Sequence, residues 1–388
     1  MRILMVSPEF PPIAGGVGRY TYNLVEALRK LDCEVLVLSD NKGYGDYMGI
    51  SPSNNDNSNI VLKVVDEVQP DIVHIQFEPG LYGLKLALNS YNSKTYLDSF
   101  YYQCKTPIVT TFHSGYTFKE WMYLAMSIKK SGRTRQIGIP ARLVVKMWTN
   151  LLHYRSFMEI NRKKLRQSKA GICFSSYMSK LLGGGHIIYH GAEPAIQNVP
   201  DKKEIRKKLS LPTDKKLAVI VGFQTVTKGW DLLNKLKMPN DWIMVTNSAK
   251  GDYNKEEIDR SFNKNSEIID LKRGYLNDME LSLLLFASDA VLLPYKITSG
   301  SGVMFDALSH GLPFISTDLE FFKEFANMDL GIIAKRDPKS FSNAILRLGK
   351  NYEKYHGAVK NFKLSLKWDT IANQHIKIYN NNNNNNKK

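Results

Sequence analysis

The amino terminus alternates between short apolar runs and a helical pattern, and this alternation limits the fold more than any other feature. Residues 2–7 (RILMVS) are apolar and end in a loop rich in proline and glycine, as a buried strand does. Residues 17–31 place Leu24, Leu28 and Leu31 at helical spacing, and residues 33–39 (CEVLVLS) form a second apolar run. This strand–helix–strand order predicts a βαβ unit. Because such a crossover joins strands that run in the same direction, the chain must build a parallel sheet.

The alternation occurs in two series, which predicts two domains. The first series continues through strand candidates at residues 71–76, 107–112 and 171–175. The second comprises residues 216–222, 242–246, 268–271, 290–294 and 313–316. One hydrophobic core rarely grows beyond roughly 250–300 residues, so two cores suit a chain of 388. We therefore predict an α/β protein with two Rossmann-like, doubly wound parallel-sheet domains that face a cleft, since such sheets bind ligands beyond the carboxyl ends of their strands.

Local composition sets the expected boundaries. Residues 187–215 are charged and rich in turns, so the first domain is predicted over residues 1–195 and the second over residues 196–355. Glycine, asparagine and serine dominate residues 41–59, which predicts a flexible loop. Residues 380–388 hold seven asparagines and two lysines and are expected to be a disordered tail.

Composition excludes several classes of protein and directs attention to charge. No apolar run approaches the ~18 residues of a membrane-spanning helix, and the amino terminus does not match a signal peptide. The three cysteines, Cys33, Cys104 and Cys173, lie far apart, which argues against a disulfide scaffold and favours a reducing, cytoplasmic compartment. The formal net charge of +16 indicates an anionic partner, although a solvated basic surface would give the same number.

Three loops after predicted strands could bind such a partner. Gly15 and Gly16 precede the first helix, where a backbone can approach a phosphate or a sugar closely; a structural turn is an equal alternative. Lys228 follows the first strand of the second series and could neutralise a diphosphate, although most lysines are simply solvated. Ser301, Gly302 and Val303 open a helix whose amino terminus can hold an anion, with Asp306 on its first turns.

Taken together, short motifs along residues 1–379 resemble those of the retaining glycosyltransferases of the GT-B fold, in family 4. Each stretch alone is weak, but their order and spacing are specific. The stretches are residues 7–12 (SPEFPP) with 15–17 (GGV), 70–74 (PDIVH), 110–113 (TTFH), 190–191 (HG), 228–229 (KG) and 301–313 (SGVMFDALSHGLP). The closing stretch is similar to the family's last helix, so a helix over about residues 356–379 is expected to return to the first domain.

The resemblance implies roles for matching residues. Gly15 and Gly16 would contact the donor diphosphate or sugar through the backbone, and His113 would lie beside the transferred sugar. Lys228 would bind the diphosphate, Gly302 and Val303 would offer N–H groups to the phosphate beside Ser301, and Asp306 would hold the ribose. Two positions depart from the family: Thr298 replaces the first glutamate of its Glu-x7-Glu motif, and Phe223 replaces a frequent basic residue.

These roles imply a metal-independent transfer. The leaving diphosphate can be stabilised by Lys228 and helix-start amides in place of a metal, and the sequence contains no Asp-x-Asp. We expect no cofactor beyond the nucleotide diphosphate sugar, linked to UDP or GDP, from which a hexose passes to a glycan or a lipid-linked acceptor. The alternatives are a catalytically weak GT-B scaffold and a basic module that binds polyanions or nucleic acid. The sequence contains no nucleic-acid-binding motif, which places the last alternative lower.

The positive charge concentrates in residues 128–169, which hold twelve Lys or Arg and one acid, Glu159. Large apolar residues alternate with these charges, as in a helix that lies on an anionic membrane. A core-facing helix with a basic outer face is the alternative. The residues assigned to the acceptor or membrane side are Glu9, Lys129, Lys130, Trp148, Arg162, Lys163 and Lys164.

Overall fold

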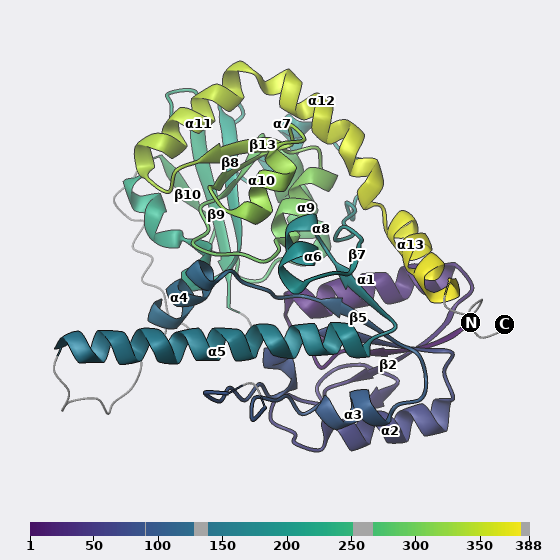
Figure 1. The fold of residues 1–388 in the computed structure, drawn as a ribbon. Helices are drawn as coiled ribbons and strands as arrows, with labels where there is room; N and C mark the ends of the chain where they lie inside the picture. The colour runs from purple at the N-terminus through teal and green to yellow at the C-terminus, as the bar shows by residue number, and fades with distance from the viewer. Residues whose placement is uncertain (90, 128–138, 251–266, 382–388) are drawn as a thin grey trace. The chain divides into compact units, whose positions relative to one another are not determined.

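The structure is a computed structural model that describes residues 1–89, 91–127, 139–250 and 267–381 (Figure 1). The chain divides into two compact units. Unit 1 comprises Met1–Tyr189 and Ile371–Lys388, and unit 2 comprises His190–Thr370. The first division falls a few residues before residue 195, where the sequence analysis places the domain boundary.

Unit 1 is built on a seven-stranded sheet in the order β3-β2-β1-β4-β5-β6-β7, and every strand pair is parallel. Its elements are β1 (Arg2–Val6), α1 (Gly16–Lys30), β2 (Glu34–Ser39), β3 (Tyr47–Met48), α2 (Asn57–Val68), β4 (Ile72–Phe77), η1 (Pro79–Tyr82), α3 (Asp98–Gln103), β5 (Ile108–Phe112), α4 (Phe118–Ser127), α5 (Ile139–Gln167), β6 (Ala170–Cys173), α6 (Ser176–Leu182), β7 (His186–Ile187) and most of α13 (Trp368–Asn380).

Unit 2 repeats the plan with a six-stranded parallel sheet in the order β10-β9-β8-β11-β12-β13. Its elements are α7 (Lys202–Lys208), β8 (Lys216–Phe223), η2 (Val226–Lys228), η3 (Trp230–Lys235), β9 (Trp242–Ala249), β10 (Ile268–Asp270), α8 (Asp278–Ala287), β11 (Ala290–Leu293), α9 (Gly302–Ser309), β12 (Phe314–Thr317), α10 (Glu320–Ala326), β13 (Gly331–Ala334), α11 (Pro338–Lys350), α12 (Tyr352–Phe362) and η4 (Lys363–Leu366).

The two sheets confirm the predicted fold class of two doubly wound parallel sheets. In each, the chain order reverses beside the first strand, so the gap between β1 and β4 and the gap between β8 and β11 are the topological switch points. Ligands of such sheets bind beyond the carboxyl ends of the strands at these points. The loops that leave β1, β4, β8 and β11 are therefore where a site is expected.

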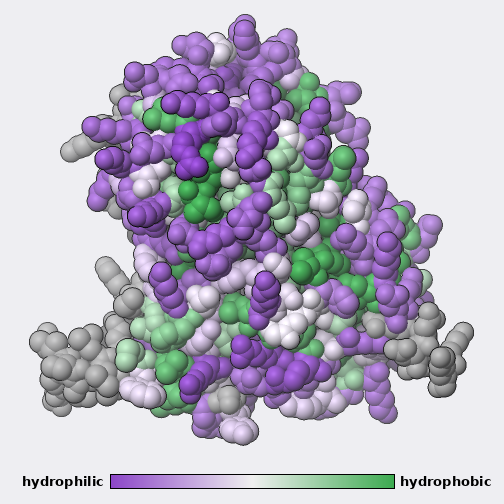
Figure 2. Space-filling view, turned by 45° about the horizontal axis from the view of Figure 1, so that its top comes forward, coloured by the Kyte–Doolittle hydropathy of each residue, from purple (hydrophilic) through white to green (hydrophobic). Residues whose placement is uncertain are grey.

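Apolar residues on both faces of each sheet form the cores. In unit 1 the buried aromatic side chains include Phe77, Tyr82 and Phe112, which pack ring against ring. In unit 2, Phe305, Phe321 and Phe325 form a comparable cluster. Hydrophilic side chains dominate the molecular face drawn in Figure 2.

Two expectations for irregular segments need correction. Residues 41–59 are not one loop, because they contain β3 and the start of α2. The side chain of Asn57 accepts from the N–H of Ser51 and donates to the carbonyl of Ser51, which fixes the approach to α2.

The chain end also differs from the expected single helix over residues 356–379. It forms α12, the 3₁₀ turn η4 and α13, and Asn380 still belongs to α13. The rest of the predicted tail, residues 382–388, lies outside the described residues. Tyr379 of α13 contacts the first sheet, since its hydroxyl lies 2.7 Å from Nδ1 of His74 in β4.

Candidate active site

The loop after β1 brings a buried carboxylate to the start of α1. Oε2 of Glu9 accepts hydrogen bonds from the N–H groups of Val17 (2.8 Å) and Gly18 (3.0 Å). A side chain on Gly15 would overlap the Glu9 carboxylate, since an ideal Cβ there would lie 1.8 Å from its carboxyl carbon. Gly15 is thus required by packing. Because Gly15 has no side chain that could cap α1, the Glu9 carboxylate accepts the hydrogen bonds of the first turn instead.

This arrangement corrects one assignment and limits another. Glu9 is buried in unit 1, so it does not form part of a membrane-facing surface, and a role on the acceptor side stays a prediction. Its negative charge also offsets the positive end of the α1 dipole, which makes that end less attractive to a phosphate. Gly16 differs from Gly15 because no atom lies within 4 Å of an ideal Cβ at this position. A close backbone approach by a ligand therefore stays a prediction for Gly16.

His113 follows β5 and is held in one orientation. Its Nε2 lies 2.9 Å from Oε1 of Gln76 on the neighbouring strand β4, and its N–H donates to the carbonyl of Phe77. Because the Gln76 oxygen can only accept, Nε2 carries the proton. The rings of Tyr20 and Phe174 meet the imidazole edge to face, at centroid distances of 5.5 and 5.2 Å. His113 thus has a fixed ring at the carboxyl edge of the sheet, as a residue beside a substrate needs.

Glu78, which is not among the site residues expected from the sequence, directly follows β4 at the switch point. The pKa of Glu78 is raised to about 7, mainly by burial and to a smaller extent by the nearby Glu9 carboxylate, while hydrogen bonds from the Ser114 hydroxyl and the Gly80 N–H act in the opposite direction. Among the described residues, no cation lies within ion-pair distance of Glu78. Half-buried carboxylates without a cation are typical of functional sites. A charged residue directly after the strand-like stretch 72–77 was the available signal.

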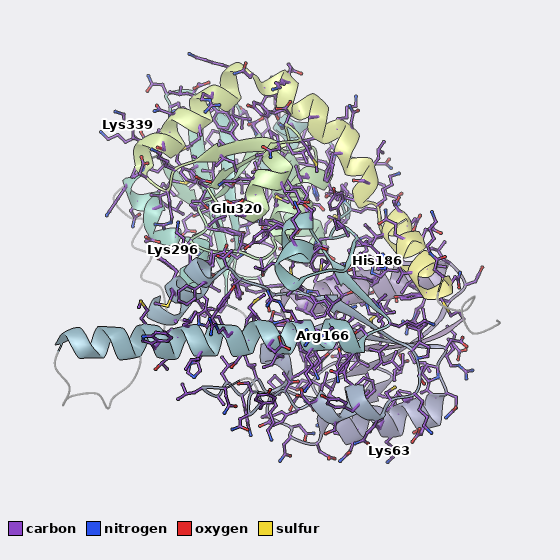
Figure 3. The ribbon with its side chains drawn as sticks, in the orientation of Figure 1. Lys63, Arg166, His186, Lys296, Glu320 and Lys339 are labelled. Carbon is purple, nitrogen blue, oxygen red and sulfur yellow. The ribbon has the colours of Figure 1, made fainter. Side chains whose placement is uncertain are left out.

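In unit 2, the loop after β8 holds Lys228 against the segment that follows β11. Gly229 has a left-handed backbone (φ 75°), and an ideal Cβ there would lie 1.9 Å from the carbonyl oxygen of Pro294, so only glycine fits. The N–H of Lys296, a residue labelled in Figure 3, donates to the carbonyl of Thr227 at 2.8 Å. These contacts place Nζ of Lys228 3.9 Å from the ring centroid of Tyr295, in a cation–π arrangement.

Tyr295 also connects Lys228 to the amino terminus of α9. Ser301 donates to the Tyr295 hydroxyl (3.3 Å), and its Oγ accepts from the N–H of Met304 as the helix cap. Gly302 and Val303 occupy the first turn, where N–H groups have no partner within the helix. An ideal Cβ on Gly302 would lie 3.5 Å from Nε2 of His190. A cation, a helix start and an imidazole therefore surround one place in unit 2.

The remaining predicted donor residues are less open. Asp306 lies on α9, but its side chain is 4% exposed, so a ribose contact stays a prediction. Thr298 donates to the carbonyl of Gly300 (2.5 Å) and shapes the turn before α9. Phe223 ends β8 and stacks on Tyr275 at a centroid distance of 6.2 Å. The departure at Phe223 thus creates an aromatic pair at the strand end, where the family often has a basic residue.

The structure corrects one of the basic residues assigned to a surface. Lys164 is completely buried, and its Nζ lies 2.9 Å from Oδ1 of Asp98. Trp148 is 56% exposed, and Arg162 and Lys163 lie along a surface groove, in accord with a surface role. Lys129 and Lys130 lie outside the described residues.

In the described part of the chain, no group of three or more His, Cys, Asp or Glu side chains could hold a metal ion. Among the helices described, none is both long enough and apolar enough to cross a membrane.

Comparisons with known proteins bear on the fold and on the first unit. The model of Glycosyltransferase Family 4 matches residues 14–184. No curated protein matches the sequence.

Solved structures match the chain over nearly its whole length. Sucrose-phosphate synthase from Thermosynechococcus elongatus has a TM-score of 0.66 at 14% identity, over 98% of each chain. WaaG, a glycosyltransferase involved in lipopolysaccharide biosynthesis, has a TM-score of 0.62 at 13% identity, over 97% of this chain and 99% of its own. HepE from Anabaena, in complex with UDP-glucose, has a TM-score of 0.60 at 15% identity, over 99% of each chain. The chain therefore has the GT-B fold of these glycosyltransferases, and residues 14–184 of its first unit match the model of Glycosyltransferase Family 4.

Proposed function

We propose that the protein transfers a hexose from a nucleotide diphosphate sugar to a glycan or lipid-linked acceptor, with retention of the anomeric configuration. The observation that carries this proposal is the arrangement at the switch point of unit 2. Lys228, held over Tyr295, and the first-turn amides of α9 present positive charge to one place. A diphosphate leaving group fits that place because helix starts and lysines both stabilise anionic oxygens.

The proposed reaction needs no protein nucleophile. The bond between the anomeric carbon and the diphosphate oxygen breaks, and a bond to the acceptor oxygen forms on the same face of the sugar. The acceptor proton passes to an oxygen of the departing diphosphate. Lys228 stabilises the charge on that diphosphate, and His113 orients the sugar through its fixed ring. Glu78 accepts a hydrogen bond from an acceptor hydroxyl. This route uses neither a cofactor nor a metal.

UDP is the nucleotide to test first, since HepE is described in complex with UDP-glucose. We expect UDP to bind with a micromolar dissociation constant in calorimetry, with or without a chelator. Lys228→Ala should weaken binding by about 10- to 100-fold, because a charge-assisted hydrogen bond contributes roughly 1.5–3 kcal/mol. Lys235→Ala, an exposed lysine seven positions further along, is the matched control and should bind UDP normally.

Other outcomes would point to the alternatives. If neither UDP nor GDP bound but DNA bound tightly and in a salt-sensitive manner, the protein would be a polyanion-binding module. If UDP bound but no UDP-hexose or GDP-hexose was consumed with any acceptor, the protein would be a GT-B scaffold without turnover. Retention is read from the anomeric proton coupling in the NMR spectrum of the product.

We also propose that α5 attaches the protein to an anionic membrane surface from a cytoplasmic location. Met147 and Trp148 are 51% and 56% exposed on α5, and large apolar side chains of this kind insert at an interface. Figure 1 shows that the amino-terminal part of α5 extends beyond α4. Basic residues near an anionic surface contribute about 1 kcal/mol each, so a few suffice for reversible attachment.

Vesicle sedimentation tests this attachment. Binding should rise with the phosphatidylglycerol content, fall with salt, and drop at least about fivefold in Met147→Ser/Trp148→Ser, which removes the apolar contact. Arg347→Gln/Lys350→Gln, which removes two exposed charges on α11, is the control and should bind as the wild type does. Equal partition onto neutral vesicles, or no binding, would leave a soluble glycan as the acceptor.

A further inference from the structure

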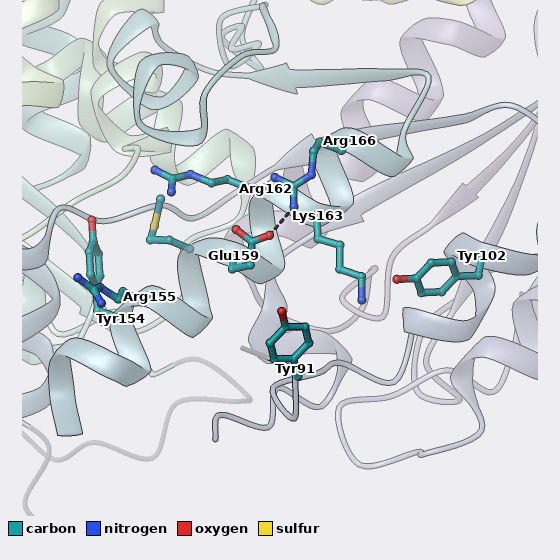
Figure 4. Close-up of a pocket in the computed structure, with 9 residues that line it drawn as sticks. Tyr91, Tyr102, Tyr154, Arg155, Glu159, Arg162, Lys163 and Arg166 are labelled. Carbon is teal, nitrogen blue, oxygen red and sulfur yellow. Dashed lines mark hydrogen bonds and ion pairs between the residues drawn. The ribbon is translucent and has the colours of Figure 1, made fainter. Parts of the chain in front are cut away.

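A groove of about 680 Å³ runs along the carboxyl-terminal half of α5 on unit 1 (Figure 4). Its second wall comes from the segment that leads into α3 and from α3 itself. The groove is lined by Tyr91, Tyr102, Tyr154, Arg155, Met158, Glu159, Arg162, Lys163 and Arg166. Its volume lies within the range of ligand pockets, roughly 300–1,000 Å³.

The lining carries four cations and one carboxylate. Glu159 is occupied by an ion pair with Arg166, a residue labelled on α5 in Figure 3. Arg162 donates to the carbonyl of Leu181 at 3.2 Å, which orients its guanidinium without neutralising it. Arg155 is exposed, and among the described residues no carboxylate lies within ion-pair distance of it. The groove therefore has a surplus of positive charge.

The remaining cation is also poorly neutralised. Lys163 is 3.9 Å from Asp98, but that carboxylate is already bound to Lys164 at 2.9 Å. Arg162 and Arg166 are four residues apart on α5, so their like charges repel each other along the helix. An anion in the groove would relieve this repulsion.

Three of the nine lining residues are tyrosines. Tyr91 is 96% exposed and Tyr102 is 67% exposed, which is unusual for side chains with so much apolar area. In Figure 4, Lys163 extends between these two rings, and its Nζ lies 4.9 Å from the ring centroid of Tyr102. The negative face of an aromatic ring attracts the partly positive C–H groups on one face of a sugar ring.

Together, these features select one ligand chemistry. We propose that this groove binds an acidic oligosaccharide segment, in which sugar rings contact Tyr91 and Tyr102 while carboxylate, sulfate or phosphate groups pair with Arg155, Arg162 and Lys163. A groove of this volume accommodates about two to four sugar units. The proposal concerns binding by unit 1 alone and holds whether or not the bound glycan is the acceptor of the transfer reaction.

The geometry favours a glycan over the other anionic partners. A bilayer surface is flat and contacts protruding side chains, whereas this lining is concave and excludes the exposed apolar pair Met147 and Trp148. A nucleic acid strand presents regularly spaced phosphates along its whole length, whereas the weakly neutralised cations of this lining are confined to the stretch of α5 from Arg155 to Lys163.

Calorimetry with the full-length protein tests the proposal. Trigalacturonate is the acidic probe, and maltotriose is the neutral probe of equal length. We expect trigalacturonate to bind at least about tenfold more tightly than maltotriose and to lose affinity as salt rises. Arg155→Gln/Arg162→Gln and, separately, Tyr102→Ala should each weaken trigalacturonate binding by about tenfold or more. UDP binding and the melting temperature should stay unchanged, which shows that the variants are folded.

Further arms give the outcomes that would overturn the proposal. Arg347→Gln/Lys350→Gln removes the same charge from unit 2 and should leave trigalacturonate binding intact. Inorganic phosphate that bound as tightly as trigalacturonate would indicate a simple anion site. Equal affinity for maltotriose, binding unaffected by the groove substitutions, or binding only to phosphatidylglycerol vesicles or a thymidine oligonucleotide would each contradict a site for acidic glycans.

Discussion

Replacing Lys164 by methionine is expected to lower the free energy of unfolding by about 3–5 kcal/mol, the usual effect of removing one partner from a buried ion pair. Lys164 is completely buried on α5, with Nζ 2.9 Å from Oδ1 of Asp98 and 4.3 Å from the ring centroid of Tyr101. Burial lowers the pKa of Lys164 to about 8, although Asp98 beside it acts in the opposite direction. The cation is thus kept charged at neutral pH mainly by Asp98, and each charge depends on the other.

Urea unfolding of three variants separates the ion pair from simple loss of packing. Lys164→Met leaves the Asp98 carboxylate with its hydrogen bonds from Thr95 and the long contact to Lys163, so it should be the least stable of the three. Lys164→Met/Asp98→Asn removes both charges and should recover most of the loss. Lys163→Met is the matched control, because its side chain is partly exposed and its ion pair is long, and it should change stability by less than about 1 kcal/mol. Equal stability of Lys164→Met and Lys163→Met would contradict the buried pair.

The fold could be predicted from the sequence because its signals are local. An apolar strand followed by a helix with leucines at helical spacing predicts a βαβ unit, and β1, α1 and β2 occur where the pattern places them. The start of α9 was predictable for the same reason, since the Ser301 hydroxyl caps the helix by accepting a hydrogen bond from the N–H of Met304, three residues later. Interactions over a few residues leave a pattern in the sequence.

Lys164 shows why some surface assignments failed. Its neighbours in sequence are basic, so the segment resembles a solvated or membrane-facing helix face. Its partner Asp98 lies 66 residues earlier, and only the packing of α3 against α5 brings the two charges together. Composition predicts that a helix is basic, but it does not predict which of its turns faces the core.

Glu9 and Gly15 illustrate the same limit at the candidate site. The sequence predicts that position 15 needs a glycine, but it does not show whether a ligand or a neighbouring side chain occupies the space that a Cβ would fill. The structure shows that the Glu9 carboxylate occupies the space beside Gly15, whereas the space beside Gly16 is open. The sequence therefore locates the switch points well, but it does not separate residues that bind a ligand from residues that support them.

Glu78→Gln is expected to lower kcat by about 100-fold while raising thermal stability at pH 8. The first effect follows if the ionised carboxylate accepts a hydrogen bond from the acceptor hydroxyl and so orients it for the transfer, since misplacing a reacting group by about 1 Å lowers the rate by roughly 10²-fold. With the pKa of Glu78 near 7, the wild-type kcat/KM should rise as the pH rises through about 7. The amide of the variant cannot ionise, so this rise should disappear.

The stability effect has a definite sign. The pKa of Glu78 is about 7 in the folded protein and near 4.3 in an unfolded chain, so the folded state binds the extra proton between these values. Wild-type stability therefore falls as the pH rises from about 4.5 to 7 and stays low above it. Glutamine avoids the buried charge. The melting temperature of the variant should exceed that of the wild type by about 3 °C or more at pH 8, and by less than about 1 °C at pH 4.5.

Calorimetric melting at the two pH values and a pH profile of kcat/KM provide both readouts from one variant. Glu204→Gln is the matched control, because Glu204 is exposed on α7 in unit 2, and it should alter neither the profile nor the melting temperature. A Glu78→Gln protein that was more stable at pH 8 and still fully active would show that the carboxylate is merely buried. A loss of activity without the pH-dependent gain in stability would show that the charge is already solvated, and that substrate contact alone explains the effect. Only a loss of activity together with a gain in stability at pH 8 identifies Glu78 as a carboxylate that binds the acceptor and destabilises the folded protein.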